Sequence, residues 1–412
     1  EGKRGGAVAM AGGNDDSYAR STRLVTVGRS GDFADNVVNP PIWRARTHLY
    51  ANCADLKARK ARNEDGQFFY GRRGAPTQWA LAQALTALEP GAAGTVLYPS
   101  GLAALAGALL AVLRSGDVLL VADNAYEPTR NTAMGLLKSF GVEHRFFDPL
   151  DLEAFEAAFC DRTRAVMLEV PGSLTMEVCD IPALTRIARD KGAVSLIDNT
   201  WATSLGFEAL GHGCDIAITA LTKHVGGHSD LMMGAASAGE RWYRRLRLGA
   251  QQLGHVVSPD DAALALRGLR TMGVRLEQQS KTALAIAQWL DDRDEVAHVL
   301  SPMLPGGPGH NLWQRDFTGG CGLFSFVLKG RDDAARCRLI DALQLFGIGY
   351  SWGGFESLAL PFDVDPIRST MAWPKEGWGL EDRFAIRLSI GLEDKDDLIA
   401  DLTNGFAAMN EG

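Results

Sequence analysis

The sequence predicts an α/β protein with a large, mostly parallel sheet domain and a smaller α/β domain at its C-terminal end. Between residues 76 and 270, apolar runs of strand length alternate with stretches of helix length, the order of a parallel sheet covered by helices. The 412 residues suffice for two or three domains and a large core. No GxGxxG motif follows a predicted strand and opens a helix, so a dinucleotide-binding site is disfavoured.

Residues 1–75 are predicted to form an N-terminal arm. Residues 1–18 are Gly-rich and polar, and we expect them to be disordered. Residues 19–75 lack a sustained hydrophobic period and contain Pro40 and Pro41, which favours an extended segment with one or two short helices.

Residues 76–270 are predicted to form the large domain. Its expected strands are short, apolar and rich in branched residues, whereas its expected helices are longer and mostly amphipathic. We expect strands at 95–98, 118–122, 166–170, 193–197 and 216–220, and helices at 79–88, 102–113, 181–191, 241–248 and 259–272.

Residues 271–412 are predicted to form the smaller domain. A long amphipathic helix over 273–295 is expected to lead into it, and the order of the remaining elements favours an antiparallel-rich α/β layer. We expect strands at 323–328 and 384–390, and helices at 332–345 and 394–409.

Composition excludes several classes of function. The net charge is −8 and hydrophobic residues make up 46%, which fits a globular protein and argues against a nucleic-acid partner. The longest apolar stretch, 101–113, is too short to cross a membrane. The six cysteines show no CxxC spacing and no HExxH is present, so we expect no metal and a reducing, cytoplasmic location.

Asp198 and Lys223 are the two residues around which the functional hypothesis is built. Each follows an apolar run, and about twenty residues separate the runs, enough for a crossover between parallel strands. Both side chains are therefore expected at the carboxyl edge of the sheet, where ligands bind in open α/β proteins. A lysine for a Schiff base and an acid for a pyridine nitrogen are what pyridoxal 5′-phosphate (PLP) requires.

A second pattern upstream suits an anion. The predicted strand 95–98 leads through Pro99, Ser100 and Gly101 into a helix that begins at Leu102. Free backbone N–H groups at such a helix start bind phosphate, and glycine lets the anion approach. Together with Asp198 and Lys223, this pattern predicts a phosphate site formed by residues 100–102.

These motifs carry a family resemblance. The stretches IDNTWA around Asp198 and ALTKHVGGHSD around Lys223 resemble the cofactor segment of the Cys/Met-metabolism family of PLP enzymes. The resemblance extends from Thr22 to Ala408 and is strongest to the bacterial cystathionine β-lyases. It implies an aspartate-aminotransferase-like fold, the type I fold of PLP enzymes.

The resemblance implies roles for the cofactor residues. Lys223 matches the lysine that binds PLP and moves the proton, and Asp198 matches the partner of the pyridine nitrogen. Thr222 matches a phosphate contact, whereas Ala220 stands where many relatives carry a serine that also contacts the phosphate. Tyr126 matches the tyrosine that lies flat against the cofactor ring and assists proton transfer.

The resemblance also implies a substrate site and an oligomer. Arg387 matches the arginine that clamps the substrate α-carboxylate. Relatives form homotetramers, as dimers of dimers, in which a Tyr-x-Arg motif reaches the phosphate in the neighbouring subunit. The matching and adjoining positions are Tyr70 and Arg72 for the cofactor, Arg73 for a distal substrate carboxylate, and Tyr350, Ser351 and Trp352 beside the substrate.

The activity implied is α,β-elimination of L-cystathionine to homocysteine, pyruvate and ammonia, in methionine biosynthesis. Trp352 favours β- over γ-chemistry, because many γ-acting relatives carry leucine there. Asn131 replaces an aspartate of β-lyase relatives, which leaves the preference among S-substituted cysteines open. Two alternatives stay open: a γ-acting enzyme (cystathionine γ-lyase, γ-synthase or methionine γ-lyase) and a PLP-binding regulator of a partner protein.

Overall fold

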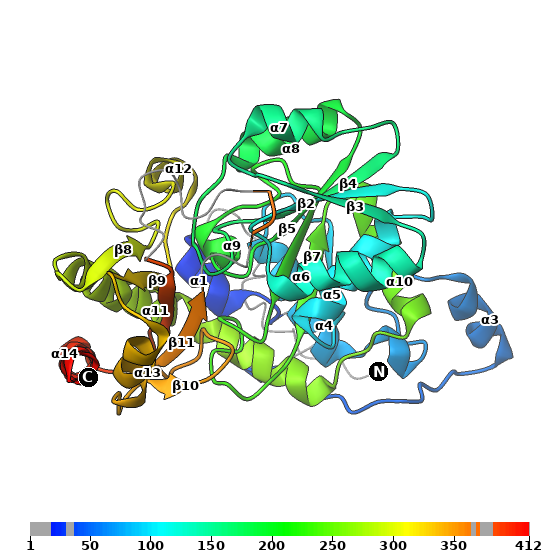
Figure 1. Cartoon of the computed structure of the whole chain (residues 1–412). Coiled ribbons are helices and arrows are strands. Elements are labelled where there is room, and N and C mark those ends of the chain that lie inside the picture. Colours follow the sequence, from blue (N-terminus) through cyan, green and yellow to red (C-terminus); the bar gives the residue numbers. More distant parts are fainter. Residues whose placement is uncertain (1–17, 30–36, 364–367, 371–381, 412) are drawn as a thin grey trace.

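The computed structural model describes residues 18–29, 37–363, 368–370 and 382–411, which form an arm and two α/β domains (Figure 1). The large domain is built on a seven-stranded sheet and the small domain on a five-stranded sheet. The expected disorder of residues 1–18 concerns a segment that lies, except for Tyr18, outside the described residues.

The large sheet is mostly parallel, as predicted. Its strand order is β1-β7-β6-β5-β4-β2-β3, and strands β2 to β6 pair in parallel, whereas β7 pairs antiparallel with both neighbours. The strands are β1 (Gly94–Tyr98), β2 (Val118–Ala122), β3 (Glu143–Phe147), β4 (Thr163–Glu169), β5 (Val194–Asp198), β6 (Ile216–Ala220) and β7 (Gly234–Ala238).

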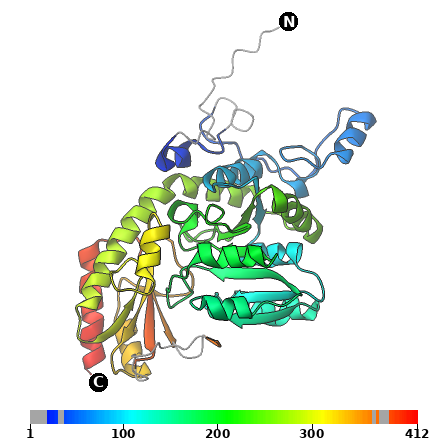
Figure 2. The same cartoon turned by 90° about the horizontal axis from the view of Figure 1, so that it is seen from above.

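Helices cover both faces of this sheet (Figure 2). In the fully buried strand β2, Leu119 and Val121 belong to one apolar cluster, with α5 and α10, while Leu120 belongs to the other, with α4, α8 and α11. The helices are α4 (Pro76–Leu88), α5 (Gly101–Val112), α6 (Glu127–Thr132) with its π-helical continuation η2 (Ala133–Leu137), α7 (Leu152–Ala157), α8 (Ile181–Asp190), α9 (Thr203–Gly206), α10 (Glu240–Leu253) and α11 (Pro259–Asp291).

Two strands of this sheet, β3 and β7, were not predicted. β3 reads EHRFF and is an edge strand in which only Phe147 is buried, so its sequence lacks an apolar run. β7 reads GAASA and is wholly buried. Its small residues fit a crowded position, because a Cβ on Gly234 would lie 2.3 Å from the carbonyl oxygen of Ser100.

The small domain is antiparallel-rich, as predicted. Its strand order is β10-β11-β12-β9-β8. Among the described strands of this smaller sheet, only β10 and β11 pair in parallel. The elements are β8 (Val296–Leu300), α12 (His310–Asp316), β9 (Leu323–Leu328), α13 (Asp333–Asp341), β10 (Gly347–Ile348), β11 (Leu358–Asp363), β12 (Phe384–Ser389) and α14 (Lys395–Asn410).

The arm follows its prediction of an extended segment with short helices. It contains α1 (Arg20–Thr26), α3 (Cys53–Ala61) and the 3₁₀ turn η1 (Gly71–Arg73). Figure 2 shows α3 projecting from the large domain on the side away from the small domain. No helix among the described residues combines the length and the apolar character needed to cross a membrane.

Helix α11 joins the two domains. It runs unbroken for 33 residues and contacts α4 of the large domain as well as β8, β9 and α14 of the small one. The predicted boundary between residues 270 and 271 falls inside this helix. The backbone of α11 at Gly268 also touches the turn after β6, since a Cβ there would lie 2.2 Å from the Val225 oxygen and 2.3 Å from that of Gly226.

Gly268→Ala should therefore destabilise the protein. The added methyl group meets backbone atoms that cannot rotate away, and overpacking of this kind costs about 1–3 kcal/mol in the free energy of unfolding. Urea denaturation would show a lower midpoint. Gly249→Ala in α10 is the matched control, because its Cβ would lie 3.6 Å from that of Ala111, an ordinary contact. That variant should be neutral or stabilised, and equal midpoints for the two would contradict the packing at Gly268.

Candidate active site

Three parallel strands deliver chemistry to one edge of the large sheet. β4 ends at Glu169 and β5 ends at Asp198, and these two residues are paired in register. β6, next to β5, ends at Ala220, three residues before Lys223. The structure therefore brings Asp198 and Lys223 to the same edge, as their positions after two apolar runs predicted.

Lys223 carries a partly buried amine that contacts two residues of the small domain. Its Nζ donates a hydrogen bond to the hydroxyl of Ser351 at 2.8 Å and lies 5.1 Å from the ring centroid of Trp352. Burial and, to a smaller extent, the positive charge of Arg387 lower the pKa of the amine from 10.5 to about 8, against the opposing effect of Asp198. Near neutral pH this lysine carries a substantial neutral fraction, as a nucleophile or base requires.

Asp198 is held by its neighbour in sequence. Its Oδ1 accepts hydrogen bonds from the backbone N–H of Thr200, at 2.9 Å, and from the Thr200 hydroxyl. The same hydroxyl accepts the N–H of Ala220 at 2.9 Å, which ties the carboxylate to the end of β6. Burial raises the pKa of Asp198, while the Thr200 bonds and the Lys223 charge favour the carboxylate.

Glu169 is a site residue that the sequence analysis missed. Its Oε2 accepts the backbone N–H of Tyr126 at 2.7 Å. Burial and the neighbouring Asp198 charge hold its pKa well above the usual range of a glutamate. The signal that could have identified it is its place one residue before the end of the strand predicted at 166–170, because the carboxyl ends of parallel strands form the ligand-binding edge.

Tyr126 is the N-cap residue of helix α6, and its side chain is about half exposed. Burial and the charges of Glu169 and Asp198 raise the pKa of its hydroxyl, and the charge of Arg387 opposes that rise. The phenol is thus a neutral group lying within the electrostatic reach of both Asp198 and Arg387.

Arg387 is a buried cation in the middle of β12. Its side chain donates to the carbonyl oxygen of Ser351 at 2.8 Å, and its Nε is buried without a hydrogen-bond partner. Across the described residues no carboxylate lies within ion-pair distance of it. Burial lowers its pKa to about 10. A buried arginine without an acid is costly unless an anion completes the site, so the geometry indicates a carboxylate or phosphate ligand.

The start of α5 has the geometry of the predicted anion site. Ser100 is the N-cap residue, and its hydroxyl accepts the N–H of Ala103 at 3.0 Å. The amides of Gly101 and Leu102 lie in the first turn, where helices leave N–H groups without internal acceptors. A Cβ on Gly101 would lie 2.7 Å from that of Ala220, so glycine also allows α5 to pack against β6.

The remaining residues to which the sequence drew attention differ in how far they are buried. The Thr222 hydroxyl is engaged with the backbone of Met233, donating at 3.1 Å and accepting at 3.0 Å. Tyr350 is 87% exposed, whereas Trp352 is partly buried. Asn131 is exposed on α6 and contacts Glu127 at 3.5 Å.

Tyr70, Arg72 and Arg73 do not reach Lys223 within one chain. Arg72 donates to the carbonyl of Gln251 at 2.6 Å, and the Arg73 guanidinium lies over the ring of Phe69 at 4.0 Å. Tyr70 is exposed.

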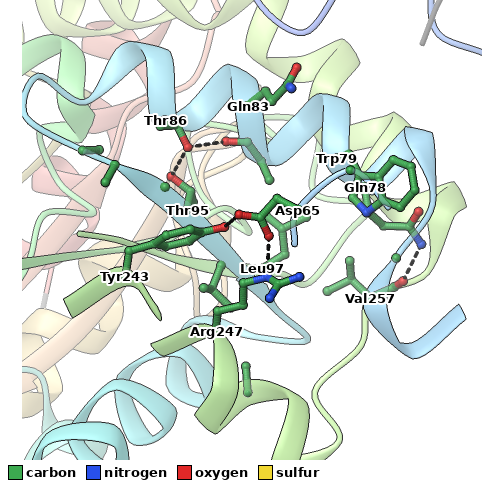
Figure 3. Close-up of a pocket in the computed structure, with 18 of the residues that line it drawn as sticks. Asp65, Gln78, Trp79, Gln83, Thr86, Thr95, Leu97, Tyr243, Arg247 and Val257 are labelled. Atoms are coloured by element: carbon green, nitrogen blue, oxygen red, sulfur yellow. Dashed lines mark hydrogen bonds and ion pairs between the residues drawn. The ribbon is translucent and has the colours of Figure 1, made fainter. Parts of the chain in front are cut away.

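Arg72 and Arg73 line a separate cavity of about 820 Å³ between the arm, α4, β1 and α10. Figure 3 shows this cavity, in which Tyr243 and Arg247 both point toward Asp65, with the Tyr243 hydroxyl 2.6 Å from the carboxylate. Lys223, Asp198 and Arg387 are not among its lining residues.

Comparison with known proteins gives a consistent result. A family model described as Cys/Met metabolism PLP-dependent enzyme matches residues 21–407. A cystathionine β-lyase of Escherichia coli, MetC, is 43% identical over 94% of this chain and 98% of its own. One from Salmonella typhimurium is 43% identical over the same shares. The crystal structure of metB from Corynebacterium glutamicum superimposes with a TM-score of 0.84 at 29% identity, covering 95% of this chain and 98% of that one.

The lowered pKa of Lys223 is measurable in cofactor-free protein. Modification of its amine by trinitrobenzenesulfonate, followed by peptide mass spectrometry, should rise with pH around a midpoint near 8. Arg387→Leu should move the midpoint upward, because it removes a positive charge that lowers the pKa. Asp198→Asn should move it downward, because it removes the charge that raises the pKa. A midpoint for Lys223 near 10.5, the ordinary value of a lysine, would contradict its burial.

Proposed function

The chain belongs to the Cys/Met-metabolism family of PLP-dependent enzymes, and from this premise we propose that it is a carbon–sulfur lyase, a cystathionine β-lyase. The reaction is the α,β-elimination of L-cystathionine to homocysteine, pyruvate and ammonia. The observation that carries the proposal is Arg387, a buried arginine without an acid partner among the described residues, beside an amine whose pKa is about 8. Together they fit the α-carboxylate and the α-proton of one amino acid.

The residues at the sheet edge fit PLP. Lys223 supplies the amine that the cofactor binds, and the Asp198 carboxylate has hydrogen bonds to Oδ1 that leave Oδ2 for the pyridine nitrogen. The first amides of α5 suit the phosphate. When bound, PLP withdraws electrons from the α-carbon of an attached amino acid and makes its α-proton acidic.

Lys223 acts as the base and then as the acid in this proposal. Its Nζ would remove the α-proton of the bound amino acid. The carbon–sulfur bond at Cβ then breaks, and the same nitrogen can return a proton to the departing sulfur, which leaves as homocysteine. The remaining three-carbon fragment is released by water as pyruvate and ammonia. A pKa of about 8 lets the same amine accept the α-proton and later donate a proton to the sulfur near neutral pH.

Arg387 and Tyr126 orient the substrate. The guanidinium holds the α-carboxylate in a forked contact, using the Nε that has no partner among the described residues, while Ser351 fixes the other end of the group. Tyr126, which lies within the electrostatic reach of Asp198, is proposed to be the tyrosine that would contact the cofactor ring. Its neutral hydroxyl is then available to assist the proton transfer, as an acid or as a donor.

The arm is proposed to serve a neighbouring subunit. Tyr70 and Arg72 lie away from Lys223 in their own chain, and Tyr70 is exposed, which supports a role in the partner's phosphate site. Arg73 is proposed for a distal carboxylate of the substrate. We infer a homotetramer built as a dimer of dimers, in the cytoplasm, where the six free thiols of this chain stay reduced.

The identity of the products tests the reaction. Purified protein given L-cystathionine should release pyruvate, measured with lactate dehydrogenase and NADH, together with homocysteine. Lys223→Ala should abolish both the products and the visible absorbance of the bound cofactor. Cysteine with 2-oxobutyrate would instead identify γ-chemistry, and normal cofactor absorbance without any turnover would favour a regulator or another sulfur amino acid.

Mixing two inactive variants tests the shared site. Arg72→Ala and Lys223→Ala each damage every site of their own oligomers. If the arm completes the neighbour's site, a mixed dimer has one site with both Arg72 and Lys223 intact. Refolding the two variants together should then restore up to about a quarter of the wild-type activity, because half of the dimers are mixed and each has one good site. No recovery in a sample shown to contain mixed oligomers would exclude the shared arrangement.

A further inference from the structure

We propose that His224 is a positioning residue: its imidazole fixes the indole of Trp352 beside the amine of Lys223 and thereby shapes the substrate site. The inference rests on the proposed function for its kinetic consequences, but its geometry stands independently of the reaction. His224 follows Lys223 directly in the chain, and the sequence analysis assigned it no role.

One indole is contacted by two consecutive residues. The rings of His224 and Trp352 meet edge to face, with centroids 5.3 Å apart and planes at 61°. The Nζ of Lys223 lies 5.1 Å from the centroid of the same indole. The indole of Trp352 therefore contacts both the imidazole of His224 and the amine of Lys223. A tilt of the indole would change the space next to that amine.

The fit beneath the Trp352 loop is tight. The loop continues through Gly353, whose φ is +83°, and a Cβ there would lie 3.1 Å from Nδ1 of His224 and 3.2 Å from its backbone nitrogen. The His224 side chain is only 1% exposed. A smaller side chain at position 224 would leave a void directly under the indole, and a residue larger than glycine at 353 would press on the imidazole.

The rest of the loop is fastened by contacts that do not involve His224. The carbonyl of Ser351 accepts from Arg387 at 2.8 Å, and that of Gly354 accepts from the side chain of Gln279 at 2.6 Å. The backbone is thus held on both sides of Trp352. The orientation of the indole is the feature that depends on His224.

The imidazole performs this role as a neutral ring. Neither ring nitrogen has a hydrogen-bond partner among the described residues. Burial, together with the positive charges of Arg275 and Lys223, lowers the pKa of His224 to about 3, and the nearby backbone of Trp201 only partly opposes this shift. The contact with Trp352 is therefore one of shape and dispersion rather than charge, and a phenyl ring should replace it.

The substitution pair His224→Ala and His224→Phe tests the proposal in the holoenzyme. His224→Ala should raise KM for L-cystathionine several-fold and lower kcat/KM about 10-fold, the upper range for loss of an aromatic pair. Cofactor absorbance should persist, because Lys223 is intact. His224→Phe should restore kcat/KM to within about twofold of wild type, since an edge-to-face ring contact is regained. If kcat/KM of His224→Phe is as low as that of His224→Ala, the proposal is overturned.

Two further measurements separate positioning from a general loss of stability. Phe155→Leu, a fully buried change outside the active site, should lower the melting temperature and leave KM unchanged. In a Trp352→Phe background, His224→Ala should have little additional effect on KM, because the indole it positions is gone. An undiminished effect in that background would show that His224 acts by another route.

A readout without turnover keeps the inference distinct from the proposed function. The emission of Trp352, taken as the difference between each protein and its Trp352→Phe counterpart, should shift to the red in His224→Ala and not in His224→Phe. If wild-type protein fails to cleave cystathionine but this shift occurs, the activity assignment fails and the positioning role stands. If the emission of Trp352 is unchanged in His224→Ala, the positioning role fails.

Discussion

The rest of the site depends on two basic side chains, the buried Arg387 and the partly buried Lys223, which lie close together beside one edge of the large sheet. Arg387 is 8% exposed without an acid partner among the described residues, and Lys223 lies close enough for each charge to affect the other. A buried cation without an acid partner is unfavourable, so Arg387 favours the binding of an anionic group such as a carboxylate. Burial and the repulsion between the Arg387 and Lys223 charges together lower the pKa of Lys223 to about 8.

The site is assembled from both domains. Asp198, Glu169 and Lys223 come from parallel strand ends of the large sheet, whereas Arg387 comes from β12 of the small sheet. α11 runs through both domains and packs its Gly268 against the turn that carries Lys223. The relative position of base and carboxylate clamp is therefore set by a continuous helix and not by a flexible linker.

How far the sequence predicted this structure varies with how local each signal is. Strands β2, β6 and β9 were predicted to the residue, because short, mostly apolar runs are visible from neighbours in the chain alone. β7 was missed, because its alanines and glycine form no strongly apolar run and become a buried strand only through pairing with β6 on one side and with β1, more than a hundred positions away, on the other. Glu169 was missed for a related reason: its raised pKa comes from burial and from Asp198 on the adjacent strand, and its hydrogen bond joins it to Tyr126, all of which it meets only in the folded protein.

The sequence by itself determined the α/β class, the family and the pair Asp198 and Lys223, since each is written in local patterns and motif spacing. Tertiary structure alone decided the environment of those residues. Burial and the charge of Arg387, which lies 164 positions further along the sequence, lower the pKa of Lys223, and the ring contact between His224 and Trp352 likewise joins distant parts of the chain. Burial and Coulomb energy depend on distance in space, and a linear pattern does not contain that distance.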